Sequence, residues 1–177
     1  MRTDYCSERS FLCILEALMP ENRLALLVSM TTGLRISDVL NLKTKDLQKE
    51  RFTIRELKTG KTRRVRLGEA LRAELLAYSG KIYVFENRLS QNKPRTRQAV
   101  YKDLKRACEC YRVNAVNIAP HSARKIYSVA QYKRTCSVER VKELLNHSDE
   151  AVTMLYALAD AVTEEKAKKR KVHLPMC

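Results

Sequence analysis

Hydrophobic positions recur at helical spacing through most of this chain. Apolar residues three and four apart occur in residues 10–19 and again in 21–32. Pro20 suits the first position of the second helix, and Gly33 suits its end. A short helix is expected to begin near Ser37 and to be followed by a polar turn. The first quarter of the chain is therefore predicted to be helical.

One stretch alternates instead of following the helical period. In "RFTIRELKTGKTRRVRL", the residues that would point to one face of a strand recur at every second position, before and after a turn that contains glycine. The residues of this face are Phe52, Ile54, Glu56, Val65 and Leu67. Such alternation on both sides of a short turn predicts a basic β-hairpin.

The rest of the chain returns to helical spacing, with one further apolar run. "KIYVFE", residues 81–86, predicts a short strand, and the following "NRLSQNKPRT" predicts a loop. Thr96 is expected to cap a helix that runs to about Tyr111. Further helices are predicted at 69–78, 121–134, 137–145 and 149–160. The fold class predicted is mainly α with a small antiparallel β-sheet, an α+β fold.

Composition limits the class of partner. The 177 residues suffice for one domain, and 35 Lys and Arg against 20 Asp and Glu give a net charge of +15. This excess of positive charge favours polyanions: DNA, RNA or an anionic membrane. The apolar runs are too short to span a bilayer and the N-terminus lacks a signal peptide, so we expect a cytoplasmic protein with six reduced cysteines. No ligand spacing typical of a metal site is present, so no metal is expected.

Three short segments carry residues that suit chemistry on a phosphate. Arg35 lies one helical turn before Asp38, and His121 and Arg124 share one face of a predicted helix. "LLNHS" places a histidine in a turn, nine residues before Tyr156. Each pattern has an ordinary explanation when taken alone: a surface ion pair, a capping histidine or a core tyrosine.

Taken in order, these motifs resemble those of the tyrosine recombinases, the phage-type integrases. "TGLRISD", the hairpin "LKTGKTRRV", "HSAR", "LLNHS" and the tyrosine follow one another between residues 20 and 160. The resemblance implies the catalytic-domain fold of that family and a site that breaks and rejoins DNA. The catalytic residues it implies are Arg35, Lys58, His121, Arg124, His147 and Tyr156, with Asp38 in support. "HSARK" and Asn146 depart from the family's usual residues without removing a reactive group.

The family's chemistry gives each of these residues an expected role. Arg35 and Arg124 clamp the phosphate, and Tyr156 attacks it to form a 3′-phosphotyrosyl intermediate. His121 is the candidate base and His147 a hydrogen-bond donor to a non-bridging oxygen. Lys58 is expected to protonate the leaving 5′-oxygen, with Lys61 across the turn as an alternative. Neither a cofactor nor a metal is expected.

Double-stranded DNA is the expected partner. The residues expected to contact its backbone are Lys43, Lys61, Arg63, Arg64, Arg95, Arg97 and Lys125. If about seven phosphates were neutralised, log affinity would fall with log salt at a slope of about −6.

The resemblance also implies a domain organisation and an assembly. Residues 1–160 are expected to form the catalytic domain and 161–177 a basic tail that docks on a neighbouring protomer, with the N-terminal clamp domain of the family absent. We expect tetramers on DNA from a protein that is monomeric or weakly associated when free. Such a chain is either a fragment or a compact recombinase.

Three other functions fit the charge. A non-catalytic DNA-binding regulator could share this fold, and a type IB topoisomerase-like enzyme would use the same nucleophile without pairing two sites. An RNA-binding module is disfavoured because aromatic residues, which stack on bases, make up only 6% of the chain.

Overall fold

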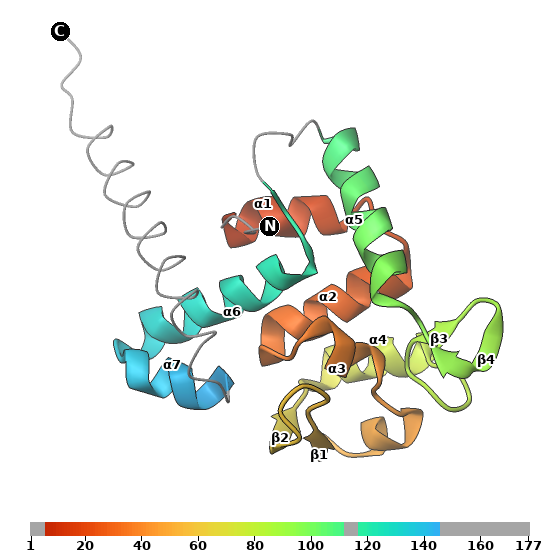
Figure 1. Ribbon diagram of the computed structural model, residues 1–177, viewed down its shortest axis with the longest axis horizontal. Helices are drawn as coiled ribbons and strands as arrows, with labels where there is room; N and C mark the ends of the chain where they lie inside the picture. Colours follow the sequence, from red (N-terminus) through yellow and green to blue (C-terminus); the bar gives the residue numbers. More distant parts are fainter. Residues whose placement is uncertain (1–5, 112–116, 146–177) are drawn as a thin grey trace, which may run out of the picture.

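The protein is mainly helical, as the sequence pattern predicts (Figure 1). The computed structural model describes residues 6–111 and 117–145. The helices are α1 Glu8–Leu15, α2 Pro20–Thr32, α3 Ile36–Leu40, the 3₁₀ helix η1 Thr44–Gln48, α4 Glu69–Tyr78, α5 Arg97–Cys110, α6 Pro120–Thr135 and α7 Val138–Leu145. The strands are β1 Arg51–Arg55, β2 Thr62–Arg66, β3 Glu86–Asn87 and β4 Ser90–Pro94.

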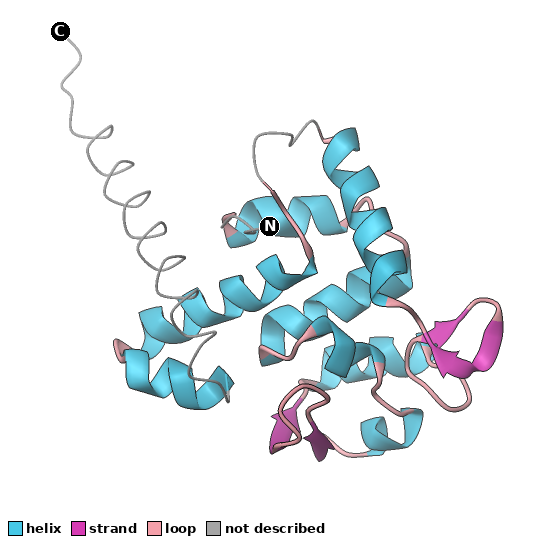
Figure 2. Ribbon diagram, in the orientation of Figure 1, coloured by secondary structure: helices cyan, strands magenta, loops and turns pink. Residues whose placement is uncertain are grey.

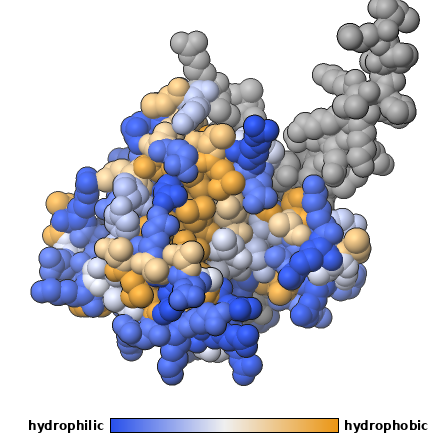
Figure 3. Space-filling model, turned by 180° about the vertical axis from the view of Figure 1, so that it is seen from behind, coloured by the Kyte–Doolittle hydropathy of each residue, from blue (hydrophilic) through white to orange (hydrophobic). Residues whose placement is uncertain are grey.

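Helix α2 forms the centre of the fold. It packs against α6 on one side and α3 on another, while α1 packs against α5 and α6 against α7 (Figure 1). Leu24, Leu26 and Val28 of α2 have 0% exposed surface. Burying a side chain of this size contributes about 1.5–3 kcal/mol. Figure 3 shows one face of the molecule, where hydrophilic residues surround a central hydrophobic area.

The start and the end of α2 follow from single residues. Pro20 occupies the first turn, where its missing N–H costs no hydrogen bond. Gly33 ends the helix with φ of 69°, and its N–H donates to the Ser29 carbonyl at 2.8 Å. Left-handed backbone of this kind favours glycine because a side chain would be strained there. The chain therefore turns sharply into Leu34 and Arg35.

The predicted hairpin is present as β1 and β2, shown in magenta in Figure 2. The strands pair antiparallel, with Phe52 opposite Val65 and Ile54 opposite Arg63. Val65 and Leu67 are buried, while Phe52 and Ile54 are half-buried against the main core. One face of this hairpin thus packs on the domain and the other carries its charge. The predicted fold class, mainly α with a small antiparallel β-sheet, is confirmed by this arrangement.

The strand predicted at 81–86 is wrong in place. Tyr83 forms only an isolated bridge with Lys43, and Val84 and Phe85 instead bury their side chains in the core. The second hairpin begins at Glu86, the last residue of the predicted strand, and its strands β3 and β4 otherwise lie where a loop was expected. The backbone of the apolar pair is also bonded: the Val84 N–H donates to the Leu42 carbonyl at 3.0 Å, and the Phe85 carbonyl accepts from the Arg95 N–H at 2.7 Å. The polar residues that follow pair around a tight turn.

Within residues 6–111 and 117–145, no helix is long and apolar enough to cross a membrane. The five cysteines of this part of the chain are not joined in disulfides. The predicted helix at 149–160 and the tail 161–177 lie outside the described residues.

Candidate active site

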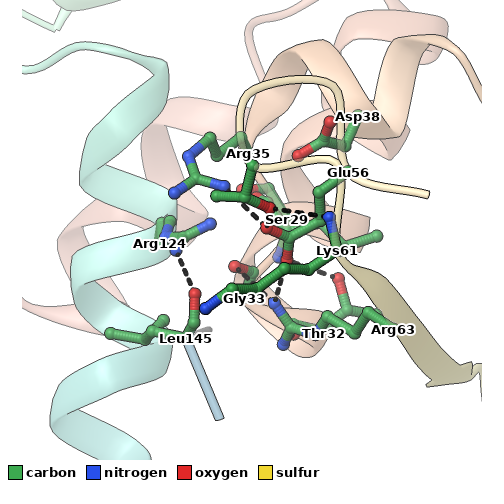
Figure 4. Close-up of polar contacts among 12 residues, drawn as sticks. Ser29, Thr32, Gly33, Arg35, Asp38, Glu56, Lys61, Arg63, Arg124 and Leu145 are labelled. Carbon is green, nitrogen blue, oxygen red and sulfur yellow. Dashed lines mark hydrogen bonds and ion pairs between the residues drawn. The ribbon is translucent and has the colours of Figure 1, made fainter. Parts of the chain in front are cut away.

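Arg35 lies at the junction that Gly33 creates between α2 and α3. It is the residue before the first turn of α3, and its carbonyl accepts hydrogen bonds from the N–H groups of Asp38 and Val39 at 2.9 and 3.0 Å. Its side chain is 12% exposed, and Nη1 donates to Glu56 Oε2 at 2.9 Å. The guanidinium is therefore held by a carboxylate of the hairpin (Figure 4).

Arg124 approaches the same place from α6. Pro120 begins this helix, and four residues later Arg124 has 0% exposed surface. Its Nη2 donates to the carbonyl of Leu145, the last residue of α7, at 2.9 Å. Burying a guanidinium is costly unless charged or polar groups surround it, so a buried arginine at this point suits an anionic ligand.

Four of the six predicted catalytic residues line one pocket of about 550 Å³. They are Arg35, Lys58, His121 and Arg124, which come from the α2–α3 junction, the hairpin turn and α6. Arg97 at the start of α5 joins them, and none of the described residues that line the pocket is acidic. The fold thus gathers five basic residues around one space, although Arg35 and Arg124 are far apart in the sequence.

Asp38 is buried on α3, and its supporting role in the site remains a prediction. It is 4% exposed, and its Oδ1 accepts a hydrogen bond from the N–H of Leu57 at 2.9 Å. Burial raises the pKa of Asp38 above its usual value, and this bond and the positive charges of Arg35 and Arg124 oppose the rise. Asp38 therefore ties the start of the hairpin turn to α3.

Glu56 is the site residue that sequence analysis missed. It is 1% exposed and lies at the end of β1, between the guanidinium groups of Arg35 and Arg63 (Figure 4). The signal was present, because Glu56 occupies an inward position in the alternating pattern of the hairpin. A charged residue at an inward position needs a partner of opposite charge.

Seven basic residues were expected to contact DNA, and the structure leaves four of them accessible and holds three inside the domain. Lys61, Arg64 and Arg97 are exposed, and Lys43 is half-buried with its ammonium 3.4 Å from the centre of the Tyr83 ring. The other three, Arg63, Arg95 and Lys125, are not on the open surface.

Arg63 and Lys125 are held within the domain. The Arg63 side chain is 12% exposed; its Nη2 donates to the Thr32 carbonyl at 2.5 Å and its Nη1 lies 3.6 Å from Glu56. It therefore binds the C-terminal end of α2, where carbonyl groups attract cations. Lys125 is 3% exposed on the buried side of α6. A surface phosphate contact does not fit either residue.

Arg95 belongs to a buried network that joins α2 and α5. It is 7% exposed, and its Nε donates to Asn22 Oδ1 at 2.6 Å. Asn22 in turn donates to Asp103, which also binds Arg106. Burial alone would raise the pKa of Asp103, but hydrogen bonds from Asn22 and Arg106 outweigh it and the pKa is lowered. The predicted DNA contact of Arg95 is replaced by this structural role.

His147 and Tyr156 lie outside the described residues. Their predicted roles therefore remain predictions. Leu145, two residues before His147 and the last described residue, accepts a hydrogen bond from Arg124.

Comparison with known proteins now identifies the family. A profile described as "Phage integrase family" matches residues 8–162, most of the chain. This chain belongs to the phage integrase family. The prediction of a tyrosine recombinase of this family, with its catalytic-domain fold, is thereby confirmed.

Related proteins carry names that agree with this assignment. The chain is 32% identical over 145 residues to a probable integrase/recombinase, YoeC, of Bacillus subtilis, which covers 79% of this chain and 78% of that protein. It is 28% identical over 157 residues to the tyrosine recombinase XerA of Pyrococcus furiosus, covering 84% of this chain and 54% of the relative. The phage integrase chain thus spans most of one relative and about half of the other.

Solved structures share the fold at lower identity. A lambda integrase dimer bound to a COC′ core site matches with a TM-score of 0.71 and 19% identity, covering 89% of this chain and 60% of that one. The catalytic domain of bacteriophage HP1 integrase matches with a TM-score of 0.64 and 19% identity, covering 88% of both chains. At 19% identity, the similarity to these two structures shows only that this phage integrase shares their fold.

Proposed function

We propose that this phage integrase is a site-specific DNA recombinase that cleaves and rejoins DNA strands through a 3′-phosphotyrosyl intermediate. The observation that carries the proposal is the convergence of Arg35, Lys58, His121 and Arg124 on one pocket without an acidic lining residue among those described. Relatives named tyrosine recombinase and integrase support it. Acting on DNA also fits the predicted cytoplasmic location.

The two arginines suit the phosphate of the scissile bond. Negative charge spreads over the equatorial oxygens when phosphorus becomes five-coordinate, and guanidinium groups bind such oxygens with paired N–H donors. Arg35 and Arg124 line the same pocket, and their side chains donate hydrogen bonds to Glu56 and to the Leu145 carbonyl, respectively. Donors fixed in this way need little rearrangement as the charge develops.

Lys58 and His121 supply the proton transfers in the proposal. Lys58 lies on the exposed hairpin turn and lines the pocket, whereas Lys61 is not among the lining residues, which supports Lys58 as the general acid. His121 is half-buried at the start of α6 and lines the same pocket. Tyr156 is the nucleophile and His147 a donor, both assigned from the sequence motif.

Covalent trapping tests the proposal. The whole chain is incubated with a pool of nicked duplexes whose bases around the nick are randomised, so that cleavage releases a short strand and the enzyme stays attached. We expect a protein–DNA adduct that survives boiling in detergent, because the phosphotyrosyl bond is covalent. Tyr156→Phe removes the attacking hydroxyl and should abolish the adduct while leaving DNA binding intact.

Two outcomes would favour other functions. DNA binding without an adduct in the wild-type protein contradicts the proposal and favours a non-catalytic regulator. An adduct accompanied by relaxation of single supercoiled plasmids, without joining of two sites, favours the topoisomerase-like alternative. Sequencing of the trapped duplexes identifies the preferred site.

Salt dependence of DNA affinity tests the revised contact set. Three of the seven predicted DNA contacts are side chains that the structure holds inside the domain. The four residues that remain as candidate phosphate contacts are Lys43, Lys61, Arg64 and Arg97. At about 0.9 per phosphate, log affinity should fall with log salt at a slope of about −4 rather than −6. Arg64→Ala should make the slope shallower by about one, as measured by fluorescence anisotropy over a range of salt concentrations. Affinity that does not change with salt would contradict backbone binding.

We also propose that the enzyme works as a tetramer on DNA. Lambda integrase structures described as a dimer on a core site and as a tetramer bound to a Holliday junction share its fold, with TM-scores of 0.71 and 0.69. Residues 1–160 would form the catalytic domain, and 161–177 would contact a neighbouring protomer. Removal of 161–177 should then reduce strand exchange between two sites more than cleavage of one.

A further inference from the structure

The carboxylate of Glu56 connects the hairpin turn to the catalytic arginine. Its Oε2 accepts hydrogen bonds from Arg35 Nη1 and from the Thr59 hydroxyl, each at 2.9 Å. Thr59 follows Lys58 directly in the turn. One oxygen atom therefore contacts both the phosphate clamp and the segment that carries the general acid.

The backbone of Glu56 closes the same turn. Its N–H donates to the Lys61 carbonyl at 3.0 Å, and its carbonyl accepts from the Gly60 N–H at 2.8 Å. Gly60 has φ of 66°, left-handed backbone that allows the tight reversal. The side chain and the main chain of Glu56 thus act on the same five-residue turn from two directions.

Two further contacts anchor this assembly to the rest of the domain. Glu56 Oε1 lies 3.6 Å from Arg63 Nη1, and Arg63 binds the last carbonyl of α2. Asp38 of α3 accepts the Leu57 N–H at 2.9 Å. The turn is therefore attached at its base to both helices that flank Arg35 (Figure 4).

Stability alone is a weak reason for this arrangement. A buried ion pair contributes little compared with a packed apolar pair, because each charge loses its hydration. A carboxylate next to a phosphate site also opposes DNA electrostatically. Its benefit is geometric, since a proton donor and a phosphate clamp must reach the same phosphate within a fraction of an ångström.

We propose that Glu56 is a positioning residue for strand cleavage: its carboxylate fixes the Lys58 turn relative to the Arg35 guanidinium. The inference rests on the proposed recombinase function. Glu56 does not touch the DNA. It determines where Lys58 lies when the phosphate is bound, and Thr59 carries that constraint into the turn.

Two substrates separate this role from a general loss of structure. One is a nicked duplex of a trapped sequence with the natural 5′-oxygen leaving group; the other has sulfur at that bridging position. A thiolate leaves without being protonated because thiols are far more acidic than alcohols, so the sulfur substrate does not need Lys58. Single-turnover rates of adduct formation are measured on both with saturating protein.

Glu56→Gln keeps the size of the side chain and removes its charge. We expect cleavage of the oxygen substrate to slow by about 100-fold and that of the sulfur substrate by only about tenfold, because misplacement by about an ångström has effects of this size. Thr59→Val removes only the contact to the turn, and should slow the oxygen substrate by about tenfold and leave the sulfur substrate near the wild-type rate. DNA affinity of Thr59→Val should stay within about twofold of wild type, since no phosphate contact is removed. That of Glu56→Gln should not fall, because the charge it loses is negative.

The matched control is Glu50→Gln, which removes an exposed carboxylate paired with Arg66 at the other end of the hairpin. It should leave both rates unchanged. Equal slowing of both substrates in Glu56→Gln would indicate a purely structural role and overturn the inference. So would a wild-type rate in that variant.

A measurement on the protein without DNA tests the role of Glu56 in the turn independently of the proposed recombinase function. Hydrogen exchange of the peptide 55–62 should be at least about tenfold faster in Glu56→Gln and Thr59→Val than in Glu50→Gln, because the turn opens more readily. If the wild-type protein forms no adduct with DNA, the proposed recombinase function is wrong. Hydrogen exchange still tests whether the Glu56 carboxylate holds the turn in place. If hydrogen exchange of this peptide is unchanged in Glu56→Gln and Thr59→Val, the carboxylate does not hold the turn, and the inference is overturned even if the wild-type protein cleaves DNA.

Discussion

Replacement of Arg124 by lysine is expected to slow strand cleavage by about 10²- to 10³-fold, the effect of losing one preorganised donor at a developing negative charge. A guanidinium has five N–H donors in a fixed fork, so Arg124 bonds the Leu145 carbonyl and faces the pocket at the same time. An ammonium keeps the charge but not this geometry. The rate of covalent adduct formation on a nicked duplex measures the effect.

Arg140→Lys on the neighbouring helix α7 is the matched control. Arg140 pairs with Glu143 on the surface and is 59% exposed, so this variant should cleave at the wild-type rate. Thermal unfolding of both variants shows whether the slower cleavage by Arg124→Lys is larger than a loss of protein stability would explain. An Arg124→Lys enzyme that cleaves within about threefold of wild type would contradict the role of the guanidinium in the transition state.

Gly33→Ala should lower the free energy of unfolding by about 2–4 kcal/mol, the sum of backbone strain and overpacking. The backbone there has φ of 69°, and an added Cβ would lie 2.4 Å from Cδ1 of Tyr127. Tyr127 is 8% exposed on α6, so neither it nor the helix end can move without disturbing the packing of α2 on α6. Urea denaturation followed by circular dichroism gives the value.

Gly60→Ala separates the two contributions. Its φ of 66° matches that of Gly33, but an added Cβ would meet only the Arg55 side chain, at 3.8 Å. This variant should lose about 1 kcal/mol from backbone strain alone. Equal losses at the two positions would show that contact with Tyr127 has no cost. Because Arg35 follows Gly33 by two residues, Gly33→Ala should also reduce cleavage.

Local chemistry explains which elements sequence reasoning found. Pro20, Gly33 and the Thr96 cap each act through their own backbone or through a residue three or four positions away, so their effects can be read in the chain. The alternation of the first hairpin is local in the same sense. The order of the catalytic motifs identified the family for the same reason.

The errors arose where distant residues compete. Val84 and Phe85 were expected in a strand, but both are buried in the core, and the paired strands β3 and β4 follow them in the sequence. Arg95 and Lys125 were expected to contact the DNA backbone, but both are buried, with 7% and 3% exposed surface. Arg95 instead lies in a buried network with Asn22, 73 positions away in the sequence, and Asn22 also bonds Asp103, 81 positions from it. Only folding brings Asn22 to these two residues.

The sequence by itself determined the family, the helices and first hairpin, and the identity of the groups that suit phosphate chemistry. Only the tertiary structure decided which cations face one pocket, which are used inside the domain, and that Glu56 lies between Arg35 and the turn of Lys58. The physical reason is that hydrogen-bond and ion-pair partners of a buried charge are chosen by distance in space. That distance depends on how α2, α6 and the hairpin pack together.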